Sequence, residues 1–419
     1  MISSRLRKAY AKPRMFLGLL RARLQGARRI PLSIGKWLVG FEPLRRMLGA
    51  PHGYRSVQSC GGRFGSGEGK IELIGPVETE EEIPLAPALF AIGNEVESKL
   101  FPCRLVANAR PVYLVRNGKY RNTTGHFELA VLDAGGQLRS ELSPDAIGPD
   151  LHRIYGQFSL QKEQRIRGRA VVLTTPGARK NYFHWCLELL PKIHLLRSCG
   201  LFQPEKDIFL INHDKARYQI QTLALLGLRA ANVARTYPGI KITADELIVP
   251  SHSSRHEAVP QWAIQFLRER FLRQSSAAGD GKKLFLDRGA AKRRILNEEE
   301  VQKYLRGRGY TIVDTAKLSF QEQVNLFRGA RSIVSCHGAG LANLCFAEGG
   351  TRLLEIFSPF YTPDYFRVLA GHLGVGYGCV SGVAPNGLAR VTERQRFSQG
   401  FELPLDRLAH AVESLEGLS

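Results

Sequence analysis

The sequence predicts an α/β protein with a parallel, doubly wound sheet, and two observations carry this prediction. Short apolar runs alternate with amphipathic segments of helical periodicity over residues 282–357, and a similar alternation begins near residue 161. Strands and helices that alternate in this order are typical of parallel sheets covered by helices. The chain has 419 residues, 44% hydrophobic and 23% charged, which is enough for two to three domains of this kind.

Residues 1–50 differ from the rest in charge. They contain twelve Lys/Arg and one acid, Glu42, so this segment carries +11 of the net charge of +21. Large apolar residues, among them Phe16, Trp37 and Phe41, accompany the cations. The combination predicts a basic amphipathic extension that binds an anionic membrane surface. A solvated basic arm and a nucleic-acid-binding segment are the alternatives.

Cysteine usage and hydropathy bear on the compartment. The seven cysteines are scattered and form no C-x-x-C pair, which favours a reducing compartment over a disulfide framework. No apolar run has the length of a membrane span, and the N-terminus lacks the apolar core of a signal peptide. We therefore expect a cytoplasmic protein, attached peripherally to the inner face of the plasma membrane.

The elements before residue 160 are predicted to be short strands between Gly- and Pro-rich turns. The expected strands are Ile71–Ile74, Val112–Val115 and Phe127–Leu132. GSGEGK at residues 65–70 resembles a phosphate loop, but the first glycine and the final Ser/Thr of that motif are missing. We interpret it as an ordinary loop.

Alternation of strands and helices marks the next hundred residues. The expected strands are Ala170–Thr174, Ile208–Ile211 and Glu246–Val249, and the expected helices are Gln219–Leu226 and Gln261–Arg273.

The pattern is clearest from residue 282 to 357. Two helices are expected there, the first capped by Asn297 with Glu300 and the second by Ser319 with Glu322. The strands expected around them are Lys283–Leu286, Tyr310–Val313, Ser332–Ser335 and, as the last of the sheet, Leu353–Ile356.

His184 and Glu188 are four residues apart in NYFHWCLELLPK, so they lie on one face of the expected helix. A histidine with a carboxylate one turn away can act as a general base with an orienting partner. A helix-surface ion pair of little consequence is the alternative. The sequence offers no third ligand for a zinc site.

Two further stretches follow predicted strands. Arg288 and the run Lys292–Arg294 come after the first of them, and arginine forks suit a diphosphate. HGAG (His337–Gly340) joins another strand to a short helix, whose N-terminus can receive an anion. The alternatives are a solvated basic loop and a tight turn in which His337 bonds to the backbone.

These stretches together resemble glycosyltransferase family 61. The resemblance rests on NYFHWCLELLPK, then LDR with RRILNEEE, then HGAGLANLCFA with GTRLLEI, in that order over roughly residues 165–360. It implies a GT-B-like architecture, in which two Rossmann-like domains face a cleft, here with a basic N-terminal extension. The corresponding division is residues 1–50, an acceptor-side domain 51–265, and a nucleotide-sugar-binding domain 266–419.

The resemblance also implies an activity. It is the inverting, metal-independent transfer of a hexosyl or pentosyl group from a nucleotide-sugar donor to a glycan or lipid-linked acceptor. The family includes bacterial enzymes that assemble surface polysaccharides such as capsule or lipopolysaccharide, and eukaryotic xylosyl- and N-acetylglucosaminyltransferases. No cofactor or metal is expected, and no nucleic-acid partner.

The family motifs assign expected roles. His184 and Glu188 are the expected catalytic pair, although relatives often carry Asp where this chain has Glu188. Asn181, Trp185 and Pro191 also match the first motif. The expected donor-binding residues are Arg288, Arg294, Asn297, His337, Gly338, Ala339, Gly340, Asn343 and Glu355. Glu355 could accept from the donor ribose or cap a turn.

Two other function classes fit parts of the sequence. The pI of about 9.9 suits a basic nucleic-acid-binding protein, but no known binding module supports it. A non-catalytic carbohydrate-binding protein of the same fold would carry the same motifs without turnover.

Overall fold

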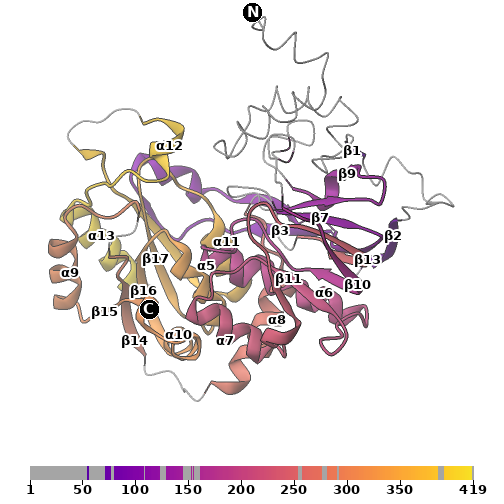
Figure 1. Cartoon of the computed structure of the whole chain (residues 1–419). Helices are drawn as coiled ribbons and strands as arrows, with labels where there is room; N and C mark the ends of the chain where they lie inside the picture. Colours follow the sequence, from indigo (N-terminus) through magenta and orange to yellow (C-terminus); the bar gives the residue numbers. More distant parts are fainter. Residues whose placement is uncertain are drawn as a thin grey trace, which may run out of the picture.

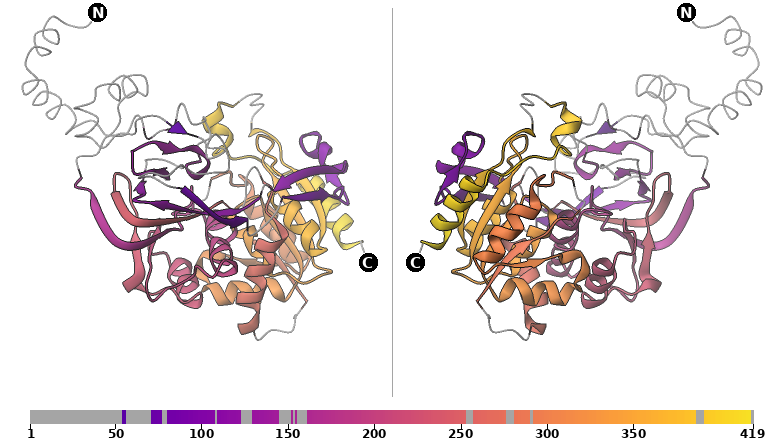
Figure 2. Two further views of the ribbon diagram at one scale, coloured as in Figure 1. Left: turned by 90° about the vertical axis from the view of Figure 1, so that its right-hand side faces the viewer. Right: turned by 90° about the vertical axis from the view of Figure 1, so that its left-hand side faces the viewer.

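The computed structural model describes residues 54–55, 71–76, 80–107, 109–122, 129–144, 152, 154, 161–252, 257–275, 281–289, 292–385 and 391–417. These residues form two α/β units, each built on its own sheet, that lie side by side (Figures 1 and 2). The fold class predicted from the sequence is therefore confirmed. The basic segment 1–50 and the GSGEGK loop lie outside the described residues.

The first unit contains a mixed sheet of ten described strands in the order β1-β9-β8-β7-β13-β10-β11-β12, with β6 paired to β13 and β2 to β6. Four of them, β10 to β13, are parallel, and β6 and β7 run antiparallel to β13. The strands are β1 (Tyr54–Arg55), β2 (Ile71–Pro76), β6 (Pro111–Arg116), β7 (Lys119–Arg121), β8 (Ala130–Leu132), β9 (Leu138–Arg139), β10 (Gln164–Val172), β11 (Ile208–Ile211), β12 (Val233–Arg235) and β13 (Lys241–Pro250).

Helices lie between and after the strands of this unit, and those from α5 to η7 fall between its parallel strands. They are η3 (Ser140–Leu142), α5 (Tyr182–His184), the π-helical turn η6 (Trp185–Leu189), α6 (Lys192–Ser198), α7 (Arg217–Leu225), η7 (Ala230–Asn232), α8 (Gln261–Phe271) and η8 (Leu272–Gln274). The predicted helices over residues 219–226 and 261–273 are thus confirmed as α7 and as α8 with η8.

The second unit contains six parallel strands in the order β15-β14-β16-β17-β18-β4. They are β4 (Ala91–Ile92), β14 (Lys282–Leu286), β15 (Thr311–Val313), β16 (Ala330–Cys336), β17 (Arg352–Phe357) and β18 (Gly376–Ser381). The helices are α9 (Glu298–Gly307), η9 (Thr315–Lys317), α10 (Phe320–Arg328), the 3-10 helix η10 (Ala339–Phe346), α11 (Tyr365–Leu373), α12 (Glu393–Arg396) and α13 (Leu405–Glu416).

Strand order fixes where ligands can enter. In doubly wound sheets the crevice opens beyond the carboxyl ends of the two strands between which the strand order reverses. In the second sheet β14 lies between β15 and β16, so this point falls between β14 and β16. In the first sheet it falls between β13 and β10, because β10 is followed by β11 on its other side.

The structure corrects three sequence-based expectations in the second unit. Leu353–Ile356 is not the last strand, because β18 follows it and pairs with it. The segment after HGAG is a 3-10 helix. Asn297 precedes α9 without capping it, since its Nδ2 donates to the Leu403 carbonyl at 2.9 Å and its Oδ1 accepts from the Leu403 N–H at 3.0 Å. The capping box of Ser319 and Glu322 is present as predicted.

One segment of the first half of the chain belongs to the second sheet. Strand β4 pairs with β18 and continues into η2 (Asn94–Leu100), and the hairpin of β3 (Glu81–Leu85) and β5 (Cys103–Ala107) flanks it. Figure 2 shows this indigo segment beside the yellow elements of the C-terminal unit. The sequence-based division at residues 265/266 assigned it to the other domain.

A single apolar core joins the two units. It includes Trp185 and Leu189 from the first unit and Leu341 and Phe346 from the second, all buried. Helices α5, α7, α8, α10 and α11 lie between the two sheets in Figure 1. Among the described residues, no helix is long and apolar enough to cross a membrane.

Candidate active site

His184 lies in the first unit, on the chain that leaves the carboxyl end of β10. Asn181 begins α5, and its side chain accepts the Phe183 N–H at 2.9 Å. The helix then widens into the π turn η6, in which the Leu190 N–H donates to the Trp185 carbonyl. Such single π turns are frequent at functional sites. Buried Trp185 anchors the turn through its Nε1, which donates to Thr222 Oγ1 at 2.9 Å.

His184 and Glu188 form the pair expected from the sequence. His184 Nδ1 lies 2.8 Å from Glu188 Oε2, and the two side chains are 31% and 14% exposed. Burial lowers the pKa of His184, but the carboxylate of Glu188 outweighs burial and leaves the pKa raised. When His184 donates its Nδ1–H to Glu188, Nε2 carries the lone pair that can accept a proton.

Gly177 lets the preceding loop pass against the imidazole of His184. Its φ is +78°, and an added Cβ would lie 2.7 Å from His184 Cδ2. Any larger side chain would both strain the backbone and displace the ring. The family resemblance did not single out this glycine.

Arg288 and HGAG meet at the switch point of the second sheet, as the strand order requires. Arg288 follows β14, and its Nη1 donates to the His337 carbonyl, which follows β16, at 2.7 Å. A Cβ on Gly338 would lie 2.9 Å from Arg288 Cζ. Gly338 is therefore the glycine that admits the guanidinium, whereas a Cβ on Gly340 would meet Thr315 Oγ1 at 3.3 Å.

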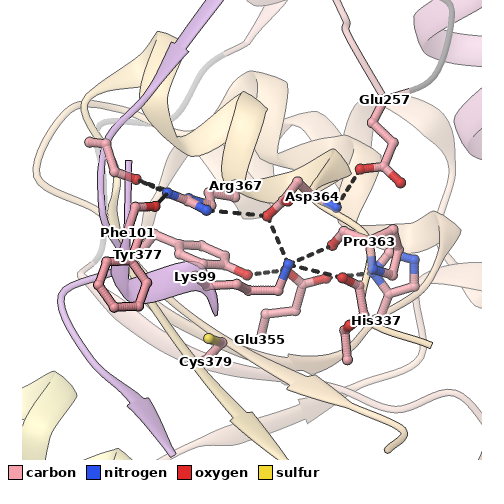
Figure 3. Close-up of polar contacts among 12 residues, drawn as sticks. Lys99, Phe101, Glu257, His337, Glu355, Pro363, Asp364, Arg367, Tyr377 and Cys379 are labelled. Atoms are coloured by element: carbon pink, nitrogen blue, oxygen red, sulfur yellow. Dashed lines mark hydrogen bonds and ion pairs between the residues drawn. The ribbon is translucent and has the colours of Figure 1, made fainter. Parts of the chain in front are cut away.

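His337 and Glu355 form a second histidine–carboxylate pair, which is buried. His337 Nδ1 lies 2.6 Å from Glu355 Oε1, and Tyr377 donates its hydroxyl to Glu355 Oε2 at 2.7 Å (Figure 3). Burial lowers the pKa of His337, against the opposing effect of Glu355, which disfavours a positive charge on the ring. Glu355 is fully buried, which contradicts the expected contact with a donor ribose.

Aromatic side chains connect the two histidine pairs across the boundary between the units. The ring centroid of Tyr365 lies 4.9 Å from that of Phe183 and 6.2 Å from that of His337. The nearby charges of Glu188 and Glu257 help to raise the pKa of Tyr365, after burial as the main cause. Phe183 also contacts the ring of His184, with centroids 5.6 Å apart, so His184 and His337 lie on two sides of one aromatic cluster.

Three residues that were expected to bind the donor have side chains in other environments. Asn297 bonds to the backbone of Leu403, as described above. The side chain of Asn343 is fully buried, where its Oδ1 accepts from Tyr182 and its Nδ2 donates to Gln323. Arg294 is exposed, and within the described parts of the chain no hydrogen bond joins its side chain to HGAG. Ala339 and Gly340 are half-buried at the start of η10.

Sequence reasoning missed several residues of the site. Arg293, and not Arg294, turns toward the site, where its guanidinium lies 4.8 Å from the ring centroid of Tyr361. Its φ of +56° produces this turn, and the sequence alone gives no sign of it. Tyr361 also packs on His337, with ring centroids 5.4 Å apart. Tyr361 and Tyr365 belong to no motif, so only the fold brings them here.

No group of three or more His, Cys, Asp or Glu suited to a metal ion occurs among the described residues. Metal independence of the reaction remains a prediction.

Comparisons with known proteins agree with the sequence motifs. Residues 182–354 match the profile of the family Glycosyltransferase 61. Over 113 residues the chain is 28% identical to a beta-1,2-xylosyltransferase of Oryza sativa subsp. japonica, a match that covers 25% of this chain and 21% of that protein. The chain thus spans about a fifth of the length of the curated relative it matches.

Two solved structures share a distant likeness with this chain. One is the heptosyltransferase TibC of enterotoxigenic E. coli in complex with ADP-D-beta-D-heptose. The match extends over 72% of this chain and 78% of the TibC chain, at 12% identity and a TM-score of 0.27. The other is the E. coli heptosyltransferase WaaC with ADP. That match extends over 60% of this chain and 100% of the WaaC chain, at 11% identity and a TM-score of 0.25.

Proposed function

We propose that this chain, whose residues 182–354 match the Glycosyltransferase 61 family, is an inverting glycosyltransferase that uses a nucleotide-sugar donor. The observation that carries the proposal is the aromatic cluster of Phe183, Tyr365 and His337, which joins the segment of His184 to the loop after β16. A base, His184, comes from the first sheet, and the anion-binding groups come from the second.

Donor binding falls to the second unit. The diphosphate lies against Arg288, the N–H groups of Ala339 and Gly340, and Arg293. These groups combine a guanidinium fork with the positive end of a helix. Burial, and after it the charge of Arg288, lowers the pKa of Arg293. An anion between them would relieve that repulsion.

The transfer step is a single displacement. The acceptor hydroxyl gives its proton to His184 Nε2, its oxygen attacks the anomeric carbon, and the bond from that carbon to the diphosphate breaks. The electron pair leaves with the nucleoside diphosphate, whose charge the arginines stabilise. Attack opposite the leaving group inverts the anomeric configuration. Glu188 holds the imidazole in the required tautomer and stabilises the imidazolium.

His184 fits the base better than His337 because of access. The side chain of His184 is 31% exposed and that of His337 is 8% exposed. A base must come within hydrogen-bond reach of the acceptor hydroxyl. We assign His337, with Glu355 and Tyr377 behind it, to positioning Arg288 through its carbonyl.

Substrates and place in the cell extend this proposal. A pentose donor is the first to test, because the rice relative is named a xylosyltransferase. We further propose that the acceptor is a glycan, lipid-linked in surface-polysaccharide assembly such as capsule or lipopolysaccharide. The basic residues 1–50 would then hold the enzyme at the anionic cytoplasmic leaflet.

A donor screen tests the function. The purified chain is mixed with each nucleotide sugar, and thermal stabilisation and nucleoside diphosphate release with a panel of methyl glycosides are recorded. A donor at a hundred times its Kd should stabilise the fold by about 2.7 kcal/mol. Release that depends on acceptor supports the proposal. Donor binding without release under any acceptor would favour a non-catalytic carbohydrate-binding protein instead.

A further inference from the structure

Glu257 stands at the switch point of the first sheet, on the side opposite His184. The chain leaves β10 toward His184 and leaves the neighbouring strand β13 toward Glu257. Residues at these two carboxyl ends flank the crevice in which doubly wound sheets bind ligands. No motif in the sequence marks Glu257.

The backbone at Glu257 adopts a conformation that few side chains tolerate. Its φ is +72°, in the left-handed region, although the residue is not glycine. Such strain costs of order 1–3 kcal/mol and persists where surrounding contacts impose it, most often at functional sites. The side chain of Glu257 is held by a hydrogen bond, in which the Asp364 N–H donates to Glu257 Oε2 at 2.8 Å.

Asp364 is itself held by a cluster of charged groups. Lys99, from the segment that crosses to the second sheet, donates to Asp364 Oδ1 at 2.7 Å and to the carbonyls of Thr362 and Pro363. Arg367 Nη1 lies 3.6 Å from Asp364 Oδ1, and its Nη2 donates to the Phe101 carbonyl. Figure 3 shows Glu257 reaching this cluster from the opposite side. One oxygen of Glu257 is therefore fixed in place.

The second oxygen of Glu257 is left for another partner. It points away from Asp364 in Figure 3, and Oε1 has no hydrogen bond among the described residues. Asp364, which holds this carboxylate, precedes Tyr365, whose ring packs on Phe183 with centroids 4.9 Å apart. Phe183 in turn contacts the ring of His184, with centroids 5.6 Å apart, so Glu257 is held at the same aromatic cluster as the proposed base.

We propose that Glu257 is an acceptor-binding residue of this site, whose Oε1 accepts a hydrogen bond from a sugar hydroxyl beside the one that attacks. This inference rests on the proposed function. The ligand class is an uncharged sugar with vicinal hydroxyls, because the Glu257 carboxylate would repel an anionic group such as the donor diphosphate. Like His184, Glu257 belongs to the first unit, whereas Arg288 and Arg293, which are proposed to bind the diphosphate, belong to the second. Burial raises the pKa of Glu257, as is usual for a partly desolvated carboxylate that can accept a further hydrogen bond.

The test uses Glu257→Gln in the full chain. The amide keeps an oxygen for the Asp364 N–H, so a residue that serves the fold alone would tolerate the change. We expect the acceptor KM to rise about tenfold or more, since bonds to charged groups are the stronger ones. Donor Kd and Tm should stay at wild-type values. Glu205→Gln, an exposed carboxylate paired with Arg229, is the matched control with unchanged kinetics.

A binding measurement separates this proposal from the proposed function. Saturation-transfer NMR with methyl β-xyloside, methyl β-glucoside and methyl β-galactoside needs no turnover. Glycoside binding by the wild type that weakens in Glu257→Gln supports the sugar contact even if no donor is ever transferred. The proposal is overturned if Glu257→Gln binds these glycosides as the wild type does, if its acceptor KM is unchanged, or if the wild type binds none of them.

Discussion

At the scale of single residues, the candidate site contains two histidine–carboxylate pairs that differ in environment. His184 and Glu188 are partly exposed, and the carboxylate raises the pKa of the imidazole. His337 and Glu355 are buried, and burial lowers the pKa of the imidazole. The same two residue types therefore give an accessible pair in one place and an enclosed pair in the other.

The pH dependence of turnover tests the role of Glu188. Protonated His184 cannot take a proton, so activity falls as the pH drops through the pKa of His184. Because Glu188 raises that pKa, the fall begins at a higher pH than for an ordinary histidine near 6.5. In Glu188→Gln only burial acts on the pKa of His184, so the acid limb of the pH profile of kcat should move to lower pH. The maximal kcat should decrease as well. An acid limb that stays in place would mean that another group titrates.

Residue types alone identified the first pair but misplaced others. The spacing of His184 and Glu188 on a helix predicts their contact, because residues four apart share a face. Asn343 and Glu355 have the residue types of ligand-binding groups, yet both are fully buried. Their partners, Tyr182 and His337, are distant in sequence, and a local pattern cannot reveal such contacts.

At the scale of elements, strand order explains why the functional loops converge. Each loop leaves the carboxyl end of a strand beside a switch point, which places Arg288 and HGAG at one sheet and the segments of His184 and Glu257 at the other. The strands and their alternation with helices could be predicted from apolar periodicity. The pairing of β4 with β18 could not, because nearly 290 residues separate them and β4 is two residues long.

Gly338→Ala tests the corner between β16 and η10. The added methyl would lie 2.9 Å from Arg288 Cζ and should push the guanidinium away from the diphosphate. We expect the Kd for nucleoside diphosphate to rise about tenfold, as for loss of a charge-assisted bond. Gly340→Ala, which approaches Thr315 Oγ1 at 3.3 Å, should have a smaller effect. Calorimetric titration measures both, and the reverse ranking would remove Arg288 from the donor site.

At the scale of the whole molecule, the two α/β units share one core and cannot be treated as separate bodies. Buried side chains of α5, η6, η10 and α10 belong to the same apolar cluster. Buried polar bonds reinforce it, since Asn343 joins Tyr182 of the first unit to Gln323 of the second at 2.6 and 2.8 Å. We expect the described residues to unfold as one cooperative unit.

Asn343→Ala tests this coupling. The change leaves the Tyr182 hydroxyl and Gln323 without their buried partner, which should cost about 3 kcal/mol. Denaturant unfolding followed by tryptophan fluorescence and by circular dichroism should give coincident transitions that both move to lower denaturant. Two separate transitions, with one unchanged by Asn343→Ala, would show that the units unfold independently.

The positive charge of residues 1–50 predicts binding to an anionic membrane surface. The full chain should sediment with anionic lipid vesicles, and a chain that starts at residue 51 should not. Because the Debye length is about 8 Å at physiological ionic strength, added salt should release part of the bound protein. Equal sedimentation of both chains would exclude a membrane role for this segment, and binding to DNA but not to vesicles would favour the nucleic-acid alternative.

The central claim is that a base from one unit activates the acceptor for attack on a donor held by the other unit, and His184→Ala tests it most directly. We predict that turnover falls by about a hundredfold or more, the usual loss for a general base, while donor Kd and Tm stay near wild type. His410→Ala, an exposed histidine on α13, serves as the control. Wild-type turnover in His184→Ala would contradict this account and place the base elsewhere.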